Sequence, residues 1–174
     1  DLELLQKENV EFFEVLGREV RVSGEFEGQK LKGFIDRLDS FHPGQVRVVD
    51  YKTGKVLDDD EKITDDNAEA IADKIFAEDI KERPKIALQF FIYDLLVRDH
   101  PLAKGRQIYN CVYSTARLFK EPPMNVPRNE KFFEAVSHRL GETLQEMYSL
   151  DVPFRRTKDE KVCEYCDFKM ICGR

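Results

Sequence analysis

The sequence lacks any apolar run of the roughly 20 residues that a membrane-spanning helix needs. Its longest apolar-rich stretch, from Ile86 to Val97, is interrupted by Gln89 and Asp94. It also lacks a recognisable signal peptide at its start, and it contains no internal repeat or low-complexity tract. We therefore expect a cytoplasmic protein that has no membrane partner.

An excess of positive charge is absent as well. Lys and Arg total 28 against 34 for Asp and Glu, which leaves a net charge of −6. This balance excludes tight binding of nucleic acid by bulk charge alone. It leaves open a basic groove on an acidic body, or a site at which metal ions supply the positive charge.

Cysteine is scarce and unevenly placed. Cys111 stands alone in an apolar run, which predicts a buried strand residue. The other three, Cys163, Cys166 and Cys172, lie in the last dozen residues with the spacing Cys-x2-Cys-x5-Cys. A secreted disulfide framework spreads its cysteines through the fold, whereas clustered thiols in a reducing compartment favour metal binding. Zinc and an iron–sulfur cluster both remain open, because both accept thiolate ligands.

The rest of the composition suits one folded domain. The chain has 174 residues, and 41% of them are hydrophobic, which is enough for a real core. It opens with Asp1 directly in a helix-like pattern, so we interpret it as an N-terminally truncated fragment of a longer protein. We expect a core over residues 1–150 and a C-terminal tail over residues 151–174 that holds the cysteine cluster.

Hydrophobic periodicity and turn residues predict the order helix, three strands, helices, strand, helix. We expect helices over 2–16, 67–82 and 84–100, and a long helix capped by Asn129. We expect strands over 18–26, 30–38, 45–51 and 107–113, with 117–119 continuing the last one after a bend. The acidic segment 58–66 is interpreted as a solvated loop. The fold class is therefore α/β, with a central mixed β-sheet flanked by helices.

Two carboxylates follow apolar pairs at strand ends, and a lysine lies two residues after the second of them. Asp50 and Lys52 project from the same face of one strand, and Asp36 lies on the strand joined to it by a hairpin. Converging carboxylates offer hard oxygen ligands for Mg²⁺ or Mn²⁺. The residues alone leave two interpretations open, a metal site and surface charges at a hairpin.

These residues resemble a known family. Gly33-x-Ile35-Asp36-Arg37-x-Asp39, followed by Val49-Asp50-Tyr51-Lys52-Thr53-Gly54, looks like the nuclease domain of the RecB/AddB type within the PD-(D/E)xK superfamily. Gln89 and Tyr93 match that family's Gln-x-x-x-Tyr motif, whose spacing places both side chains on one helix face. The resemblance runs from about Glu19 to Arg174 and implies a restriction-endonuclease-like core.

The resemblance implies a metal-dependent DNA exonuclease domain of a helicase–nuclease that acts in double-strand-break repair and recombination. Its partners would be DNA and a helicase or nuclease subunit, and its cofactor Mg²⁺ or Mn²⁺. Asp36, Asp50 and the backbone carbonyl of Tyr51 would bind the metal, and Lys52 would contact the attacking water or the scissile phosphate. Gln89 and Tyr93 would line the site and help hold the strand.

The sequence departs from the family pattern at one ligand, a glutamate that the family usually supplies from an upstream helix. Glu11, Glu14 and Glu19 are candidates, but none has a matching local motif. We expect the residue to lie in, or close to, a segment upstream of Asp1, so the fragment by itself is expected to be metal-poor or inactive. The role of Arg37 also stays open between a phosphate contact and a surface ion pair.

In the same family, three C-terminal cysteines at this spacing join one upstream cysteine to hold a [4Fe–4S] cluster. The resemblance therefore implies that Cys163, Cys166 and Cys172 bind such a cluster in the full-length parent, and that this fragment can lack it. Two other hypotheses remain: a nuclease-like lobe that no longer cuts and serves as a DNA-binding or interaction module, and a small zinc-binding interaction module.

Overall fold

A computed structural model describes residues 1–77, 82–117, 120–153, 155–157 and 160–173. The helices are α1 (Leu2–Glu8), α2 (Asp58–Glu61), α3 (Ala68–Phe76), α4 (Lys85–Val97) and α5 (Glu130–Tyr148), and a 3-10 turn, η1, covers Glu160–Cys163. The strands are β1 (Glu14–Phe26), β2 (Gln29–Ser40), β3 (Gln45–Lys52), β4 (Gln107–Ser114) and β5 (Asn125–Pro127).

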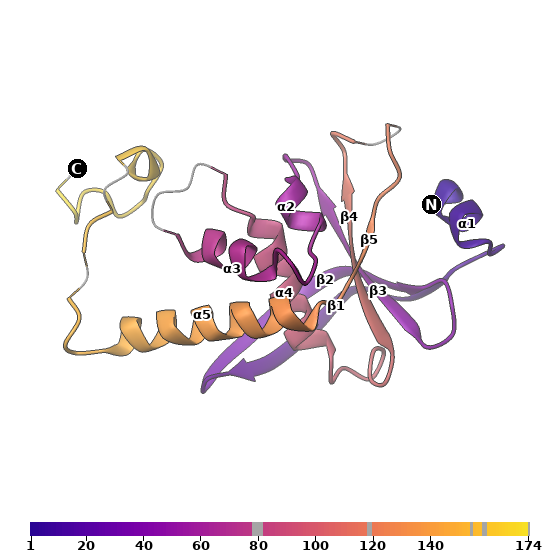
Figure 1. Cartoon of the computed structure of the whole chain (residues 1–174), viewed down its shortest axis with the longest axis horizontal. Coiled ribbons are helices and arrows are strands. Elements are labelled where there is room, and N and C mark those ends of the chain that lie inside the picture. The colour runs from indigo at the N-terminus through magenta and orange to yellow at the C-terminus, as the bar shows by residue number, and fades with distance from the viewer. Residues whose placement is uncertain (78–81, 118–119, 154, 158–159, 174) are drawn as a thin grey trace.

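The five strands form one sheet in the order β1-β2-β3-β4-β5. The pair β3–β4 is parallel and the other three pairs are antiparallel, so the sheet is mixed as predicted. The parallel pair requires a crossover, which α2, α3 and α4 supply. Helices α3, α4 and α5 lie together beside the sheet (Figure 1). The α/β fold with a mixed sheet and flanking helices is thereby confirmed.

Helix α4 lies at the centre of the molecule because its apolar residues are spread around the helix and pack on several sides. Leu96 and Val97 pack with strand residues such as Val48, while Phe91 packs with α3 and α5. Phe90 joins a third cluster with Val112 of β4. A helix held on three sides is a rigid platform for the polar residues that it carries, Gln89 and Tyr93.

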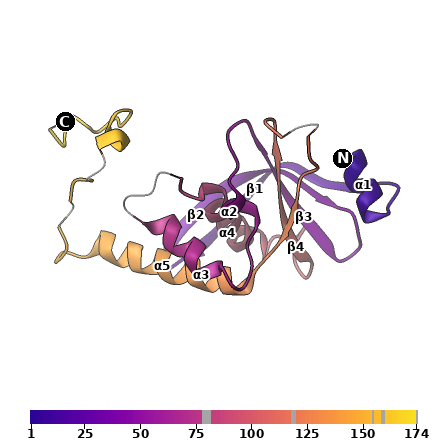
Figure 2. The same cartoon turned by 45° about the horizontal axis from the view of Figure 1, so that its top comes forward.

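The segment after α5 leaves the body of the protein. Figures 1 and 2 both place it beyond the end of α5, far from the sheet and from the N-terminus. Most of its apolar side chains are exposed, including Leu150, Tyr165 and Ile171. None of the described helices is both long enough and apolar enough to span a membrane.

Several expected boundaries were wrong for local reasons. The first helix stops at Glu8 because Asn9 adopts a left-handed conformation (φ 54°), and β1 begins at Glu14. The acidic segment is no simple solvated loop, since Asp60 and Glu61 are buried in α2. Helix α3 ends at Phe76, and Arg117 lies in a turn. The predicted helix over 67–82 also includes residues 78–81, and the predicted strand continuation over 117–119 includes residues 118–119. Both of these segments lie outside the described residues.

Other predictions hold. Asn129 caps α5, since its Oδ1 accepts the N–H of Phe132 at 2.8 Å. Cys111 is fully buried in β4, and burial raises the pKa of its thiol to about 12. It is therefore an unreactive core residue at neutral pH.

Candidate active site

The candidate site lies beneath α4 near the end of β3, where β3 separates from β2 but still pairs with β4, and Asp50 is its central residue. Asp50 is almost fully buried, and its Oδ1 accepts hydrogen bonds from the Tyr93 hydroxyl at 2.8 Å and from Gln89 Nε2 at 3.1 Å. Gln89 Nε2 also donates to the Tyr93 hydroxyl. This triangle fixes one oxygen of the carboxylate against α4.

The second oxygen of Asp50 points to Lys52. Lys52 Nζ lies 2.6 Å from Asp50 Oδ2 as an ion pair. No described residue donates a hydrogen bond of sound geometry to this buried Oδ2. Oδ1 therefore accepts two hydrogen bonds from the protein, while Oδ2 retains lone pairs for a cation or a water molecule.

Asp36 occupies the position opposite Asp50 on the neighbouring strand. Arg37 pairs with Val49 in the β2–β3 register, and the next step of that register brings Asp36 opposite Asp50. The regular ladder stops at this step, and the N–H of Tyr51 donates instead to Asp36 Oδ2 at 2.9 Å. The two strands separate here, and Asp36 stands at the opening.

The alternation of side chains between the two faces of the sheet is also interrupted in β2 near Asp36. Ile35 and Leu38 pack in the same core cluster although they are three residues apart, and strict alternation would place them on opposite faces. The position opposite Asp36 on β1 belongs to Glu19, between the pairs Arg18–Arg37 and Val20–Ile35. Glu19 has a left-handed backbone (φ 48°), a costly conformation for a residue with a side chain. Such irregularities re-aim side chains next to functional sites.

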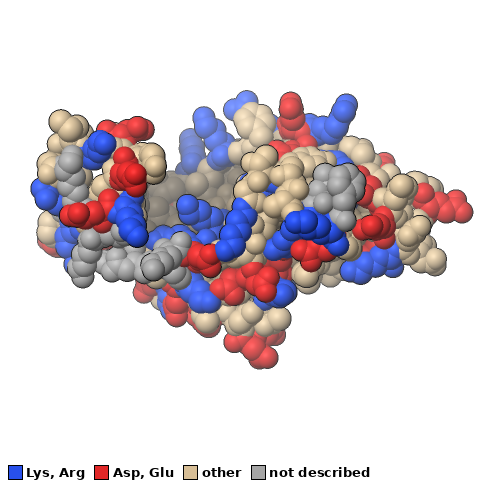
Figure 3. All heavy atoms as spheres, turned by 90° about the horizontal axis from the view of Figure 1, so that it is seen from above, with Lys and Arg blue, Asp and Glu red and all other residues tan. Residues whose placement is uncertain are grey.

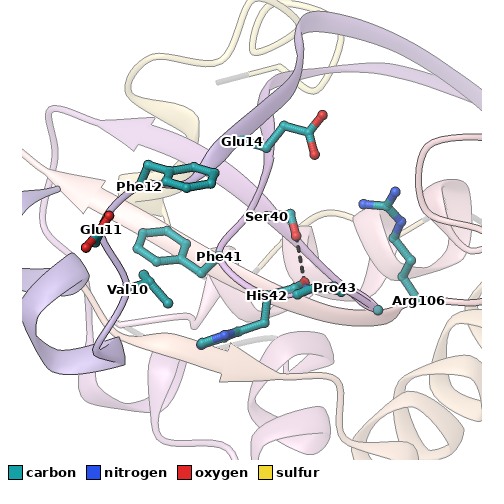
Figure 4. A pocket seen from close by; sticks show the side chains of 10 residues that line it. Val10, Glu11, Phe12, Glu14, Ser40, Phe41, His42, Pro43 and Arg106 are labelled. Carbon is teal, nitrogen blue, oxygen red and sulfur yellow. Dashed lines mark hydrogen bonds between the residues drawn. The ribbon is translucent and has the colours of Figure 1, made fainter.

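A cavity of about 880 Å³ opens at this point, lined by Arg18, Glu19, Asp36 and Tyr51. The residues that line this cavity distinguish between the three glutamates that are candidates for the missing metal ligand. Glu11 and Glu14 line a different pocket, beside Phe12, Phe41 and His42, as Figure 4 shows. Of the three, Glu19 alone shares a cavity with Asp36. Arg18 was not predicted from the sequence as a site residue. Its position beside Asp36 follows only from the register of β1 and β2.

The environment of Tyr93 keeps its hydroxyl protonated. Burial and the negative charge of Asp50, together with the hydrogen bond to that carboxylate, raise the pKa of Tyr93 well above its ordinary value. A protonated hydroxyl is a permanent donor, so Tyr93 can donate its hydrogen bond to Asp50 Oδ1 throughout the physiological pH range.

Helix α4 begins at a position fixed by the acidic segment. Asp60 Oδ1 accepts the N–H groups of Ile86 and Ala87 at 2.9 and 3.1 Å, and Asp60 Oδ2 accepts the N–H of Leu57 at 2.9 Å. A buried carboxylate at a helix N-terminus is favourable for both hydrogen bonding and the helix dipole. The acidic run made this residue look like solvated surface, and only its tertiary contact reveals its role.

Arg37 is used within the fold. Its Nε lies 2.8 Å from Asp39 Oδ2, and its guanidinium stacks over Phe13, Tyr51 and Tyr113. The structure therefore favours the ion-pair alternative for this residue.

The residues present fit a hard divalent cation in their chemistry. Two carboxylates and a peptide carbonyl at a strand end are the oxygen donors that Mg²⁺ and Mn²⁺ prefer, and the spare oxygen of Asp50 is suitably placed. Within the described residues, no three Asp, Glu, His or Cys side chains gather closely enough to form a ligand set. A cation here would rely on backbone oxygen and water for the rest of its coordination.

The three C-terminal cysteines lie apart from this site. Each is half-buried in the segment around η1, and the N–H of Cys166 donates to the carbonyl of Cys163 in a tight turn. Across the described part of the chain, Cys163, Cys166 and Cys172 form no set of three ligands around one point.

Comparisons with known proteins give one family match and two partial structural similarities. Two solved structures are similar in part: a Eubacterium rectale protein with a provisional exonuclease assignment (16% identity, TM-score 0.47, 87% of this chain and 50% of that chain), and SSO0001 (19%, 0.45, 98% and 66%). This chain thus spans about half to two thirds of their lengths. A search of curated proteins finds no match. The sequence model of the PD-(D/E)XK nuclease superfamily matches residues 2–173. The chain therefore belongs to the PD-(D/E)XK nuclease superfamily.

Proposed function

We propose that this chain is the metal-dependent DNA exonuclease domain of a helicase–nuclease of the RecB/AddB type. Residues 1–150 form the nuclease core, and residues 151–174 form a separate cysteine-bearing tail. The observation that carries the proposal is the buried Asp50, held by Gln89 and Tyr93 on one oxygen and paired with Lys52 on the other. Three of the family's motif residues, Lys52, Gln89 and Tyr93, thus contact the fourth, Asp50.

The side chains have distinct roles in phosphodiester hydrolysis. When bound, a divalent cation held by Asp36, Asp50 and the Tyr51 carbonyl activates water and stabilises charge on the phosphate. Lys52 contacts the attacking water or a phosphate oxygen, and Asp50 fixes the position of its ammonium. Gln89 and Tyr93 are positioning residues, because they reach Asp50 Oδ1 and leave Oδ2 free.

The test is a cleavage assay on labelled DNA with Mg²⁺ or Mn²⁺, performed on this chain and on the longer polypeptide to which we assign it. Lys52→Ala should lower the rate by roughly 100-fold or more, as expected for loss of a group that acts in the transition state. Lys55→Ala is the matched control, since Lys55 is exposed and pairs with Glu82. Equal activity of the Lys52 and Lys55 variants would refute the assignment.

A second candidate is a nuclease-like lobe that binds DNA without cutting it. The observation in its favour is the lack of a third acidic ligand close to Asp36 and Asp50 within the described residues. The two candidates differ in metal binding. Calorimetric titration with Mn²⁺ should show binding that Asp50→Asn removes if the chain is a nuclease, and no binding if it is an inert lobe.

The iron–sulfur cluster and the partner subunit stay predictions that rest on the cysteine spacing and the family resemblance. The longer polypeptide, purified without oxygen, should contain iron and absorb visible light, and changing Cys163, Cys166 and Cys172 to Ser should abolish both. Stoichiometric zinc without iron would assign the tail as a structural zinc site.

A further inference from the structure

The β1–β2 ribbon has an outer face that carries an exposed aromatic ring among cations. Phe34 is 65% exposed, and in the register it lies directly opposite Arg21. Lys32 and Lys30 follow at alternate positions along β2, and all three cations are exposed. Because side chains alternate between the faces of a strand, these residues share one face.

The opposite face of the ribbon packs on α4. Gly24 of β1 and Gly33 of β2 pair near one another, and a Cβ at Gly24 would lie 3.0 Å from Leu96. At Gly24 the backbone of the ribbon therefore lies close to the Leu96 side chain of α4. The side with Phe34 therefore faces away from the core.

The charge on this face is not neutralised by the protein. Arg18, Arg21, Lys30 and Lys32 form no ion pair with any described residue. Two glutamates flank these cations: Glu25, opposite Lys30 at the end farther from the active site, and Glu19, opposite Asp36 at the nearer end. Viewed from above, Lys and Arg side chains border a hollow between the C-terminal segment and the main body (Figure 3). In a chain of net charge −6, a local basic surface is a specific feature.

The face leads to the cavity beside Asp36. Phe34 precedes Asp36 by two residues, which is about 7 Å along a strand. Arg18 lines the same cavity as Asp36 and Tyr51. A ligand lying along the ribbon would therefore reach Asp36 and this cavity, whereas Asp50 lies on the inner side of the sheet, beneath α4.

We infer that the outer face of the β1–β2 ribbon is a docking surface for single-stranded nucleic acid, with Phe34 stacking on a base and Arg21 and Lys32 contacting the backbone. A single strand is favoured over a duplex because only unpaired, unstacked bases present their faces to an aromatic ring. The inference rests on the proposed function for the direction of the strand, from the ribbon toward Asp36.

The test measures the fluorescence anisotropy of labelled oligonucleotides about 15 nucleotides long. EDTA is present to remove divalent cations, so that no cleavage occurs. The probes are oligothymidylate, its RNA counterpart and a duplex of the same length. Phe34→Ala should weaken binding of the single strands by roughly 5- to 100-fold, the range measured for loss of one base stack, and change duplex binding by less than twofold. Phe34→Tyr should retain binding. DNA and RNA strands should respond alike, because stacking does not read the sugar.

Two controls make the result specific. Phe12 is 75% exposed on the other pocket, and Phe12→Ala should leave binding unchanged. Lys32→Ala should reduce the slope of log affinity against log salt by about 0.7, whereas Lys104→Ala should not. The inference is overturned if Phe34→Ala binds single strands as the parent does, or if the Phe12 and Phe34 variants lose affinity equally.

Failure of this inference can be told apart from failure of the proposed function. Normal strand binding by Phe34→Ala, with cleavage lost in Lys52→Ala, would overturn the docking surface alone. Cleavage retained in Lys52→Ala would overturn the nuclease assignment whatever the binding result. Melting temperatures of the Phe34 variants should match the parent, since the ring is exposed.

Discussion

Asp94 of α4 follows Tyr93 directly but faces a different and fully enclosed environment. Its Oδ1 accepts a hydrogen bond from Asn110 Nδ2 at 2.9 Å, and burial raises its pKa to about 7 despite that bond and the nearby Arg128. No described residue satisfies the buried Asn110 Oδ1. We predict that Asp94→Asn stabilises the protein at neutral and alkaline pH, because an amide carries no charge and can donate to Asn110 Oδ1.

The size of the effect follows from linkage. An ordinary Asp has a pKa of 3.8, so between pH 3.8 and about 7 the unfolded chain releases a proton that the folded chain keeps. Stability from this group is therefore greatest below pH 3.8, falls as the pH rises, and is constant above about 7. The full difference is about 4 kcal/mol, since each tenfold change is worth about 1.4 kcal/mol. The gain from Asp94→Asn should be about 1.5 kcal/mol at pH 5 and about 4 kcal/mol at pH 8.

Urea denaturation followed by far-ultraviolet circular dichroism measures this difference. Both proteins are unfolded at pH 5 and pH 8, so that the titration of all other carboxylates cancels. Asp99→Asn is the matched control, because Asp99 is exposed and should change stability by less than about 0.5 kcal/mol at either pH. A gain from Asp94→Asn that does not grow with pH, or a loss at pH 8, would refute the account.

Three further outcomes are expected. Tyr93→Phe should cost about 1–2 kcal/mol in urea denaturation by removing a bond to the Asp50 carboxylate, whereas Tyr109→Phe should cost less than about 0.5 kcal/mol; equal costs would contradict the contact. Glu19→Gln should weaken Mn²⁺ binding in calorimetry by about 30-fold, because a carboxylate about 4 Å from a divalent cation in water contributes about 2 kcal/mol, and Glu14→Gln should not; an unchanged affinity would exclude Glu19 from the site. Glu19→Gly should raise stability by about 1 kcal/mol, because glycine adopts the left-handed backbone without strain, and a loss would show that no strain is stored there.

The sheet was predictable because its signals are local. The turns at Gly28 and Gly44, both with positive φ, separate three runs of alternating apolar residues, and they fix the antiparallel order of β1, β2 and β3. The long helix α5 was predictable from its Asn129 cap and apolar stripe. The short strand β5 was not expected, since three residues after two prolines give no periodicity.

The site was predictable in part for the same reason. Asp50 and Lys52 are two residues apart on one strand, and Gln89 and Tyr93 are one helical turn apart, so each pair is fixed by local geometry. The contact of Gln89 and Tyr93 with Asp50 depends on how α4 crosses the sheet. In the sequence, only the family resemblance indicated that these residues belong to one site. No sequence pattern predicts the interrupted alternation of β2 at Asp36 or the left-handed backbone of Glu19. They arise where two strands separate, which is a property of the assembled sheet.

The hydrogen bonds from Asp60 to the start of α4 have a consequence for how this protein can vary in length. They join the chain shortly after Lys52 to the chain shortly before Gln89, and Arg83 closes a second link to the carbonyls of Ile75 and Ala77. A length change between α3 and α4 therefore falls inside a closed loop and is not transmitted to Asp50. Each doubling of that loop should cost only about 0.6 kcal/mol. This connection is thus the place where insertions, a fused reporter domain or new chain ends can be accommodated with the catalytic geometry unchanged.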